Sequence, residues 1–227
     1  MTYFESAAKP YVGMGMEGAV ARWYASLTRK SLAEFTALAE RVSERLHSGD
    51  RVLEVAPGPG YFAIELAKLG DYRISGVDIS STFVEIARAN AEEENVTVDF
   101  RQGNAAILPF PDATFDFLLC RAAFKNFTRP LAALQEMYRV LKPGGEALII
   151  DLRRDASPES IREAVQQMKL GAVNALITSL TFRFMLLRRA YTKPEFEEMV
   201  GHTRFGSGEI RIENIGLEVS LKRSNYA

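Results

Sequence analysis

The stretch Val52-Leu-Glu-Val-Ala-Pro-Gly-Pro-Gly-Tyr61 decides the fold, because a short apolar run breaks there into two closely spaced glycines. Its aliphatic residues suit a strand that is buried on both faces of a parallel sheet. Gly58 and Gly60 lack the β-carbons that would obstruct a tight turn, and the helix expected after them offers unpaired N–H groups. The stretch therefore predicts a strand, a turn and a helix that together hold a nucleotide-like ligand.

Glu54 is the one charged residue between Val52 and Tyr61. A carboxylate is costly to bury without hydrogen-bond donors, so Glu54 requires backbone amides, or the hydroxyl or ammonium groups of a ligand. The turn also matches G-x-G-x-x-G/A from Gly58 to Ala63, and Asp78 follows at the spacing of about 20 residues expected for a ribose-binding acid of dinucleotide-binding proteins. A nicotinamide cofactor is therefore one interpretation of this region.

The run from Asp50 to about Asp151 resembles the class I S-adenosylmethionine (SAM) dependent methyltransferases. Glu54-Val-Ala-Pro-Gly-Pro-Gly60 is similar to the family's first motif, E/D-x-G-x-G-x-G, with Ala56 in place of the first glycine. That alanine argues against a positive φ at this position. Gly76-Val-Asp78-Ile-Ser looks like the second motif, which implies that Asp78 accepts hydrogen bonds from both ribose hydroxyls.

Two later segments carry the rest of the resemblance. Gln102-Gly-Asn104-Ala-Ala looks like the adenine-contacting loop, with Asn104 where the family usually has Asp. An amide carbonyl can still accept a hydrogen bond from the adenine amino group. The segment Glu136-Met-Tyr-Arg-Val-Leu-Lys-Pro-Gly-Gly145 resembles a helix and turn that have no counterpart in the dinucleotide motif. Four motifs in family order therefore favour SAM over a nicotinamide cofactor.

The resemblance implies which residues contact the cofactor and the methyl acceptor. The cofactor-binding residues are expected to be Glu54, Ala56, Gly58, Gly60, Asp78, Ile79, Asn104, Ala105 and Arg121. Residues on the acceptor side are expected to be Tyr24, Phe124, Lys125 and His202. A desolvated Lys125 could bind an anionic acceptor or act as a base, although an exposed loop lysine is favoured. A surface turn is likewise favoured for His202, and no catalytic residue is assigned.

The alternation of strand and helix patterns between residues 51 and 152 predicts an α/β fold. The resemblance implies a Rossmann-like, doubly wound, mainly parallel seven-stranded sheet with a terminal antiparallel hairpin and added N-terminal helices. We expect a single domain whose four parts are a helical cap or lid over 1–50, a SAM-binding core over 51–152, a helical insertion over 153–192, and a helix with the terminal hairpin over 193–227.

Two of these parts have more than one interpretation. Trp23 and Tyr24 lie in a predicted helix that serves either as a lid over cofactor and substrate or as simple packing on the sheet. An apolar stripe from Val173 to Leu187 suits a pocket roof, a dimer interface or a core helix. A substrate or lid role is preferred for the stripe.

Composition limits the partners of the chain. Its 28 Lys and Arg residues against 29 Asp and Glu leave a formal charge of −1, so no basic field favours nucleic acid. Two histidines and a lone cysteine give no zinc-ligand spacing, and no acidic cluster indicates a metal site. Cys120 is expected to be a small buried residue.

The sequence shows no signal peptide and no run of the ~18 apolar residues needed for a membrane span. We therefore expect a cytoplasmic protein, either monomer or homodimer.

The leading functional hypothesis is SAM-dependent methyl transfer to a small-molecule acceptor, with S-adenosylhomocysteine as product. The transfer is expected to be an in-line displacement by an O, N or C atom of the acceptor. The alternatives are a nicotinamide-dependent oxidoreductase and a SAM-binding protein without methyltransferase activity.

Overall fold

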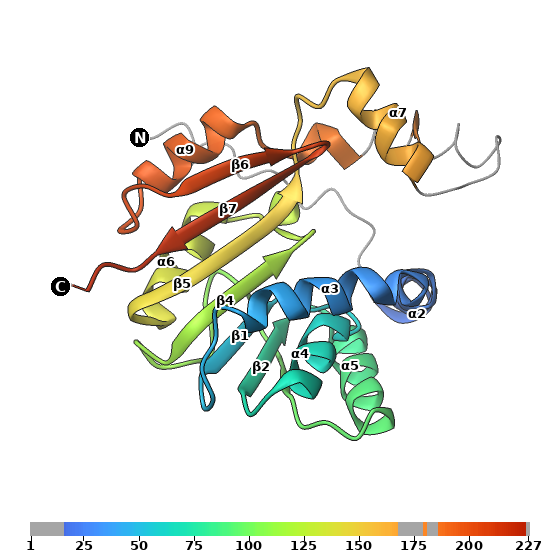
Figure 1. The fold of residues 1–227 in the computed structure, drawn as a ribbon, viewed down its shortest axis with the longest axis vertical. Helices are drawn as coiled ribbons and strands as arrows, with labels where there is room; N and C mark the ends of the chain where they lie inside the picture. The colour runs from blue at the N-terminus through green and yellow to red at the C-terminus, as the bar shows by residue number, and fades with distance from the viewer. Residues whose placement is uncertain (1–15, 168–178, 181–185, 226–227) are drawn as a thin grey trace.

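The computed structural model describes residues 16–167, 179–180 and 186–225. Helices and strands alternate through the core, as the sequence pattern predicts (Figure 1). The helices are α2 (Gly18–Thr28), α3 (Leu32–Ser43), α4 (Tyr61–Leu69), α5 (Ser81–Glu93), α6 (Pro130–Val140), α7 (Pro158–Gln167) and α9 (Lys193–Gly201), with short 3-10 helices η1 (Arg29–Ser31), η2 (Phe124–Asn126) and η4 (Leu187–Arg189). The strands are β1 (Arg51–Val55), β2 (Arg73–Asp78), β3 (Asp99–Gln102), β4 (Phe115–Arg121), β5 (Leu141–Leu152), β6 (Glu209–Glu213) and β7 (Gly216–Lys222).

The seven strands form one sheet in the order β3-β2-β1-β4-β5-β7-β6. Neighbours among β1 to β5 are parallel, whereas β7 runs antiparallel to both β5 and β6. The predicted fold class is therefore confirmed, including the terminal antiparallel hairpin. Because β1, β2, β4 and β5 are parallel, their carboxyl ends share one edge of the sheet, which we call the carboxyl edge. The opposite edge, where these strands begin, is the amino edge.

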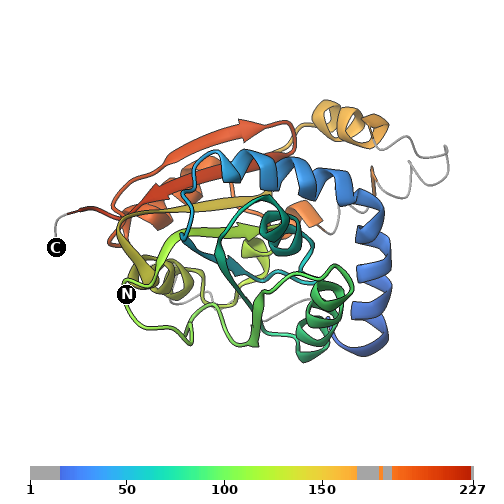
Figure 2. The ribbon, with the colours of Figure 1, turned by 60° about the horizontal axis from the view of Figure 1, so that its bottom comes forward.

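Apolar side chains fill the space on both faces of the sheet. One core joins α3, α4 and α5 to the sheet and contains the fully buried Phe62 and Leu66. The other core joins α6 and α9 to the opposite face and contains Leu134 and Phe196. Cys120 belongs to this second core and is fully buried, as predicted. The helix α2 turns away from α3 and lies beside α5 (Figure 2).

The backbone at the carboxyl edge corrects one expectation. Ala56, which follows β1, has φ +59°, so the argument from its side chain against a positive φ is wrong. Its N–H donates to Val77 O at 2.8 Å, and this bond to the neighbouring strand holds the residue in place. Ala122, which follows β4, has φ +57° and donates to Ile150 O at 2.7 Å in the same way. Strand-to-strand hydrogen bonds therefore overcome the conformational preference of alanine at both positions.

The helical insertion is described in part. Helix α7 packs through Ile161 and Val165 against Leu187 of η4. The predicted apolar stripe from Val173 to Leu187 lies outside the described residues except at Leu180, which is 46% exposed, and Leu187, which is buried. Within the described residues, no helix combines the length and the apolar character needed to cross a membrane.

Candidate functional site

The turn after β1 is shaped by two glycines. Gly58 has φ +54° and Gly60 has φ +81°, conformations that glycine adopts without the penalty of a side chain. A β-carbon on Gly60 would lie 2.6 Å from Cζ of Phe100 and 2.9 Å from Cβ of Ala87. A β-carbon on Gly58 would meet no atom within 4 Å, so that position faces open space. The turn therefore packs tightly on its inner side and is accessible on its outer side.

Asp78, at the end of β2, is fixed beside this turn. Its Oδ2 accepts the N–H of Gly58 at 2.9 Å, and its Oδ1 accepts the N–H of Ser80 at 2.9 Å. The side chain is buried, which raises its pKa, while the hydrogen bonds from these backbone amides act in the opposite direction. Each carboxylate oxygen retains a further lone pair. The arrangement fits a ligand that presents two hydroxyl groups to Asp78.

Glu54 in β1 is buried beneath the same turn, where 3% of its surface is exposed. Its Oε2 accepts the N–H of Ala63 at 3.2 Å, in the first turn of α4, so the predicted need for a backbone donor is met. Burial raises the pKa of Glu54 to about 8, although the bond from Ala63 and the charge of Arg121 lower it. A cationic ligand group placed beside Glu54 would favour its ionised form.

The loop after β3 carries the residues expected near adenine. Asn104 is exposed, and its Oδ1 accepts the N–H of Ala106 at 2.9 Å. Ala105 is half-buried and packs against the core of α6 and α9. Ile79 and Ile107 are 66% and 68% exposed, unusually high fractions for isoleucine. Ile107 was not singled out in the sequence, where it stands among Ala106, Leu108 and Pro109 and gives no distinct signal.

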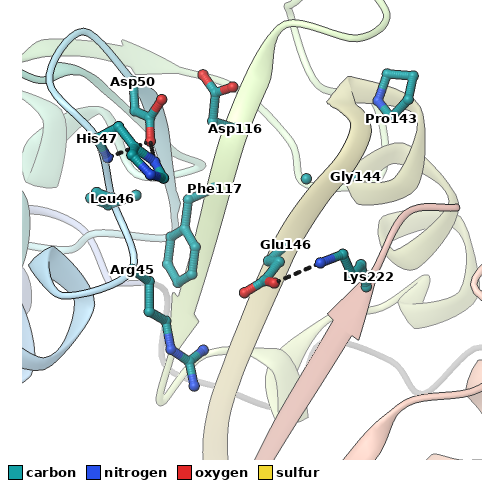
Figure 3. A pocket seen from close by; sticks show the side chains of 11 residues that line it. Arg45, Leu46, His47, Asp50, Asp116, Phe117, Pro143, Gly144, Glu146 and Lys222 are labelled. Carbon is teal, nitrogen blue, oxygen red and sulfur yellow. Dashed lines mark hydrogen bonds and ion pairs between the residues drawn. The ribbon is translucent and has the colours of Figure 1, made fainter. Parts of the chain in front are cut away.

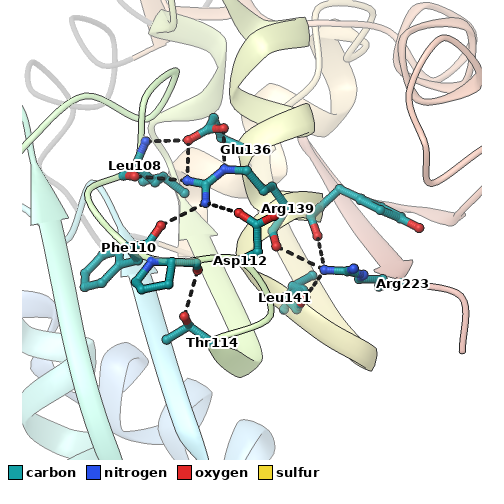
Figure 4. A network of polar contacts seen from close by, with 10 residues as sticks. Leu108, Phe110, Asp112, Thr114, Glu136, Arg139, Leu141 and Arg223 are labelled. Atoms are coloured by element: carbon teal, nitrogen blue, oxygen red, sulfur yellow. Dashed lines mark hydrogen bonds and ion pairs between the residues drawn. The ribbon is translucent and has the colours of Figure 1, made fainter. Parts of the chain in front are cut away.

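Arg139 in α6 ties down the continuation of this loop (Figure 4). Its guanidinium donates to both carboxylate oxygens of Glu136 at 2.7 Å, to Asp112 Oδ1 at 2.7 Å, to Phe110 O at 2.8 Å and to Leu108 O at 3.1 Å. Glu136 also accepts the N–H of Leu108 at 2.7 Å, and its pKa is lowered mainly by Arg139. The resemblance included both residues within a motif but did not reveal that they anchor the loop.

Arg121 ends β4 at the carboxyl edge. Its Nη2 donates to Oε2 of Glu34 in α3 at 3.0 Å, and its Cζ lies 4.5 Å from the ring centroid of Phe35. Tyr24 in α2 is half-buried, with its ring 5.9 Å from that of Phe83. Burial raises the pKa of Tyr24, while the charge of Arg121 lowers it. The N-terminal helices therefore reach the same edge as the glycine turn.

The N-terminal segment also contacts the start of α5. Glu17 accepts hydrogen bonds from the N–H groups of Ser81 and Thr82 at 3.0 and 3.1 Å. Ser80 donates from Oγ to Met16 O at 2.6 Å, and the hydroxyl of Tyr61 donates to Ala25 O at 2.9 Å. Trp23 is 64% exposed, so simple packing on the sheet does not account for it. None of the hydrogen bonds of Glu17 was anticipated from the sequence.

Lys125 differs from the exposed loop lysine that the sequence favoured. The 3-10 helix η2 carries it beneath the end of β5, where its Nζ donates to Asp151 Oδ1 at 2.9 Å and to Ala122 O at 2.6 Å. Asp151 also accepts the N–H groups of Lys125 and Leu152 at 2.8 Å. The side chains of the pair are 7% and 6% exposed. The exposed-lysine prediction is therefore wrong, and Lys125 already has two acceptors.

Two predicted acceptor-side residues lie elsewhere. Phe124 is completely buried, with its ring 5.0 Å from Phe196 and 5.9 Å from Tyr191, so it belongs to the core. His202 follows α9 and is exposed. Phe205, three residues later, packs 5.1 Å from Tyr138 near the end of α6, which leads into the start of β5. His202 therefore lies toward the amino edge. This place differs from the acceptor side that the sequence predicted for it.

A hollow of ≈ 330 Å³ opens at the amino edge, among residues that include His47, Asp116 and Gly144 (Figure 3). It is separated from the glycine turn by the length of the strands. The nearby acids have protein partners, as Glu146 does with Lys222 at 3.2 Å, so we place the candidate site at the carboxyl edge instead. Within the part of the chain that the structure describes, no group of three or more His, Cys, Asp and Glu side chains could hold a metal ion.

Part of the chain is similar to known methyltransferases. Residues 53–149 match the family model described as a methyltransferase domain. The demethylmenaquinone methyltransferase of Deinococcus radiodurans is 40% identical over 112 residues, 49% of this chain and 46% of that protein. The ubiquinone/menaquinone biosynthesis C-methyltransferase UbiE of Ruegeria sp. is 39% identical over 106 residues, 45% of this chain and 42% of that protein. The chain thus spans about half the length of the curated relatives it matches.

A solved structure shares the fold. It is assigned as an S-adenosyl-L-methionine-dependent methyltransferase of Methanococcus maripaludis, with a TM-score of 0.68, 21% identity, and coverage of 95% of this chain and 97% of that chain. In the dinucleotide fold the sheet is built from two parallel βαβαβ halves in the order 3-2-1-4-5-6. Here the antiparallel β7 lies between β5 and β6, which argues against the nicotinamide interpretation.

Proposed function

We propose that this chain, which belongs through residues 53–149 to the class I SAM-dependent methyltransferases, transfers a methyl group from SAM to a small-molecule acceptor. The carboxyl-edge residues would hold the cofactor, with S-adenosylhomocysteine as the product. The observation that carries this proposal is Asp78, which is fixed by the N–H of Gly58 on one oxygen and of Ser80 on the other. This carboxylate is oriented to accept the two ribose hydroxyls at the open side of the glycine turn.

The remaining carboxyl-edge residues fit other parts of SAM. Glu54 would interact with the cofactor ammonium through the buried carboxyl beneath the turn, while Gly58 and Gly60 let the ligand approach the backbone. Asn104 would receive the adenine amino group through its carbonyl oxygen, which has a second lone pair beside its bond to Ala106. Ile79, Ala105 and Ala56 would supply the apolar and backbone contacts of the adenosine.

Bound SAM would supply an electrophilic methyl group for in-line displacement by the acceptor. The protein's contribution is then positioning, which is worth on the order of 7 to 11 kcal/mol in favourable intramolecular cases. Lys125 is held by Asp151 and Ala122, so we assign it to positioning the turn after β4 and not to proton abstraction. Tyr24 reaches the edge from α2, and we propose that it contacts the acceptor.

We also propose that the N-terminal helices cap the cofactor site. Their contacts fall on elements that would hold the cofactor. Glu17 accepts hydrogen bonds from the start of α5, close to Asp78, and Ala25 of α2 accepts one from Tyr61, the residue after Gly60. Exposed Trp23 on α2 is consistent with a helix that rests on the core through its other side. The cap would exclude water from the reacting groups.

An aromatic acceptor of the quinone type is the first substrate class to test. The matched relatives from Deinococcus radiodurans and Ruegeria carry names that refer to menaquinone or ubiquinone methylation. This support concerns about half of each relative, and the attacked atom of the acceptor stays open. A demethylated quinone with a short side chain, chemically reduced to its hydroquinone so that the ring is nucleophilic, would be a practical substrate, since it dissolves without detergent.

The test is calorimetric binding of SAM, S-adenosylhomocysteine and NADH to the purified protein. We expect binding of the first two ligands and loss of binding by at least about 100-fold in Asp78→Ala, because two ribose hydrogen bonds to a charged group are removed. Asp71→Ala is the control, since Asp71 is exposed in the loop before β2. Binding of NADH alone would overturn the proposal. SAM binding without transfer to any acceptor would favour a binding protein.

A further inference from the structure

Arg121 is one of the residues through which the core contacts the N-terminal helices at the carboxyl edge. It ends β4, directly next to the register pair Val55 and Cys120 that brings the ends of β1 and β4 together. The ring of Phe35 packs against its guanidinium, with 4.5 Å between Cζ and the ring centroid. This contact helps to hold the guanidinium in place, since cations prefer the face of an aromatic ring.

Glu54 and Arg121 are an acidic and a basic side chain near the ends of the adjacent strands β1 and β4. Burial raises the pKa of Glu54, and the charge of Arg121 opposes this rise without overcoming it. An α-amino-acid group has an ammonium and a carboxylate on the same carbon atom. An acidic and a basic side chain at the ends of adjacent strands are suited to that zwitterion, because each attracts one of its charges.

The guanidinium of Arg121 is already paired with a carboxylate of the protein itself. Glu34 in α3 accepts a hydrogen bond from Nη2 of Arg121 at 3.0 Å. The side chain of Glu34 is 65% exposed, and that of Arg121 is 28% exposed. Arg121 is the one ion-pair partner of Glu34 among the described residues. Glu34 can therefore rotate into solvent without leaving a buried charge behind.

We propose that Glu34 occupies Arg121 in the free protein and is exchanged for the carboxylate of the cofactor's amino-acid end when the cofactor binds. The inference rests on the proposed function and adds an internal competitor to the same site. An exposed ion pair contributes little to stability, so breaking the pair between Glu34 and Arg121 costs little free energy. A glutamate left beside the bound carboxylate also repels it, which lowers affinity further.

The test compares two ligands that differ in the amino-acid end. S-adenosylhomocysteine contains that end, whereas 5′-methylthioadenosine retains the adenosine and lacks it. Glu34→Gln should tighten binding of S-adenosylhomocysteine by about two- to fivefold, the range expected for removing an exposed ion pair. It should leave the dissociation constant of 5′-methylthioadenosine unchanged. Arg121→Met should weaken S-adenosylhomocysteine by at least about tenfold with little effect on 5′-methylthioadenosine.

Glu40→Gln is the matched control, because Glu40 is an exposed glutamate on the same helix. It should change neither dissociation constant. Equal affinities of Glu34→Gln and the unsubstituted protein for S-adenosylhomocysteine would overturn the exchange, and so would parallel changes for both ligands, which indicate a general effect on the helix. If the unsubstituted protein binds neither ligand, the proposed function fails as well, so the two failures are distinguishable.

Discussion

The two edges of the sheet differ in how they accommodate charge. At the amino edge, acids are matched with lysines in contact with water, as Asp116 is with Lys142 at 2.7 Å. At the carboxyl edge Glu54, Asp78 and Asp151 are buried, and each takes at least one backbone N–H as a donor. The amino edge contains the hollow, whereas the carboxyl edge contains the buried acids, whose burial costs free energy.

A hollow alone therefore does not decide where the candidate site lies. Positive φ at alanine does not separate the edges, since Ala56 and Ala122 follow β1 and β4 while Ala113 precedes β4. Buried acids do separate them, because their burial lowers stability and such groups gather at functional sites. The buried acids of the carboxyl edge lower the stability of the fold, and their carboxylates are the groups that a ligand could bind, which makes this edge the candidate site.

The largest expected effect comes from breaking the buried pair at the carboxyl edge. Lys125→Met leaves the carboxylate of Asp151 buried with its backbone donors alone, which should lower the free energy of unfolding by about 3 to 5 kcal/mol. The matching change at the amino edge, Lys142→Met, should cost at most about 1 kcal/mol, because that pair is in contact with water. Urea unfolding of both variants measures the contrast, and equal losses would contradict it.

Glu54 should make stability depend on pH. Its pKa is raised from 4.5 to about 8 in the folded protein, so the folded state holds this proton more tightly than the unfolded state. The free energy of unfolding should therefore fall as pH rises from about 5 to 8, by on the order of 3 kcal/mol from this group. Glu54→Gln has no proton to lose there and should lack this decline.

The measurement is urea unfolding at pH 5 and pH 8 for both proteins without ligand. Glu44→Gln, at an exposed position that follows α3, is the control and should retain the decline of the unsubstituted protein. An identical pH dependence in Glu54→Gln and the unsubstituted protein would contradict the assignment of this proton to Glu54.

A pair of glycines separates backbone strain from packing. Gly60 and Gly144 have nearly equal φ, +81° and +80°, so an alanine bears similar backbone strain at both. A β-carbon on Gly60 meets the core residue Phe100 at 2.6 Å, whereas one on Gly144 meets the flexible side chain of Asn225 at 2.6 Å. Gly60→Ala should therefore cost about 2 to 4 kcal/mol, and Gly144→Ala about 1 to 2. Thermal unfolding tests this order, and a larger loss at Gly144 would reverse the packing argument.

Ala56→Gly should have the smallest effect. Glycine relieves the strain of φ +59° but adds conformational entropy to the unfolded chain, so the free energy of unfolding should change by less than about 1 kcal/mol. Binding of S-adenosylhomocysteine should be retained. Ala56→Val is the contrasting variant, since a β-branched residue is strongly disfavoured at positive φ. If Ala56→Val is as stable as Ala56→Gly, strain at this position is not significant.

The sequence predicted the glycine turn and Asp78, which the structure places side by side, because the motifs that carry them are local. The glycine turn, Asp78 and the alternation of strands and helices are each encoded within a few consecutive residues, where backbone preference and hydrophobic period act directly. The acceptor side was predicted less well. Lys125 and Phe124 were expected near a substrate, yet the turn through Ala122 buries both against elements far away in the sequence.

By itself, the sequence determined the α/β fold and the glycine turn after β1, because these follow from periodicity and from short-range backbone chemistry, whereas the seven-stranded sheet was implied by the family resemblance. Tertiary structure alone decided the positive φ of Ala56, the burial of Lys125 with Asp151, the displacement of His202 and the pairing of Arg121 with Glu34. These features depend on contacts between residues many positions apart, and their energies arise only when the chain has packed.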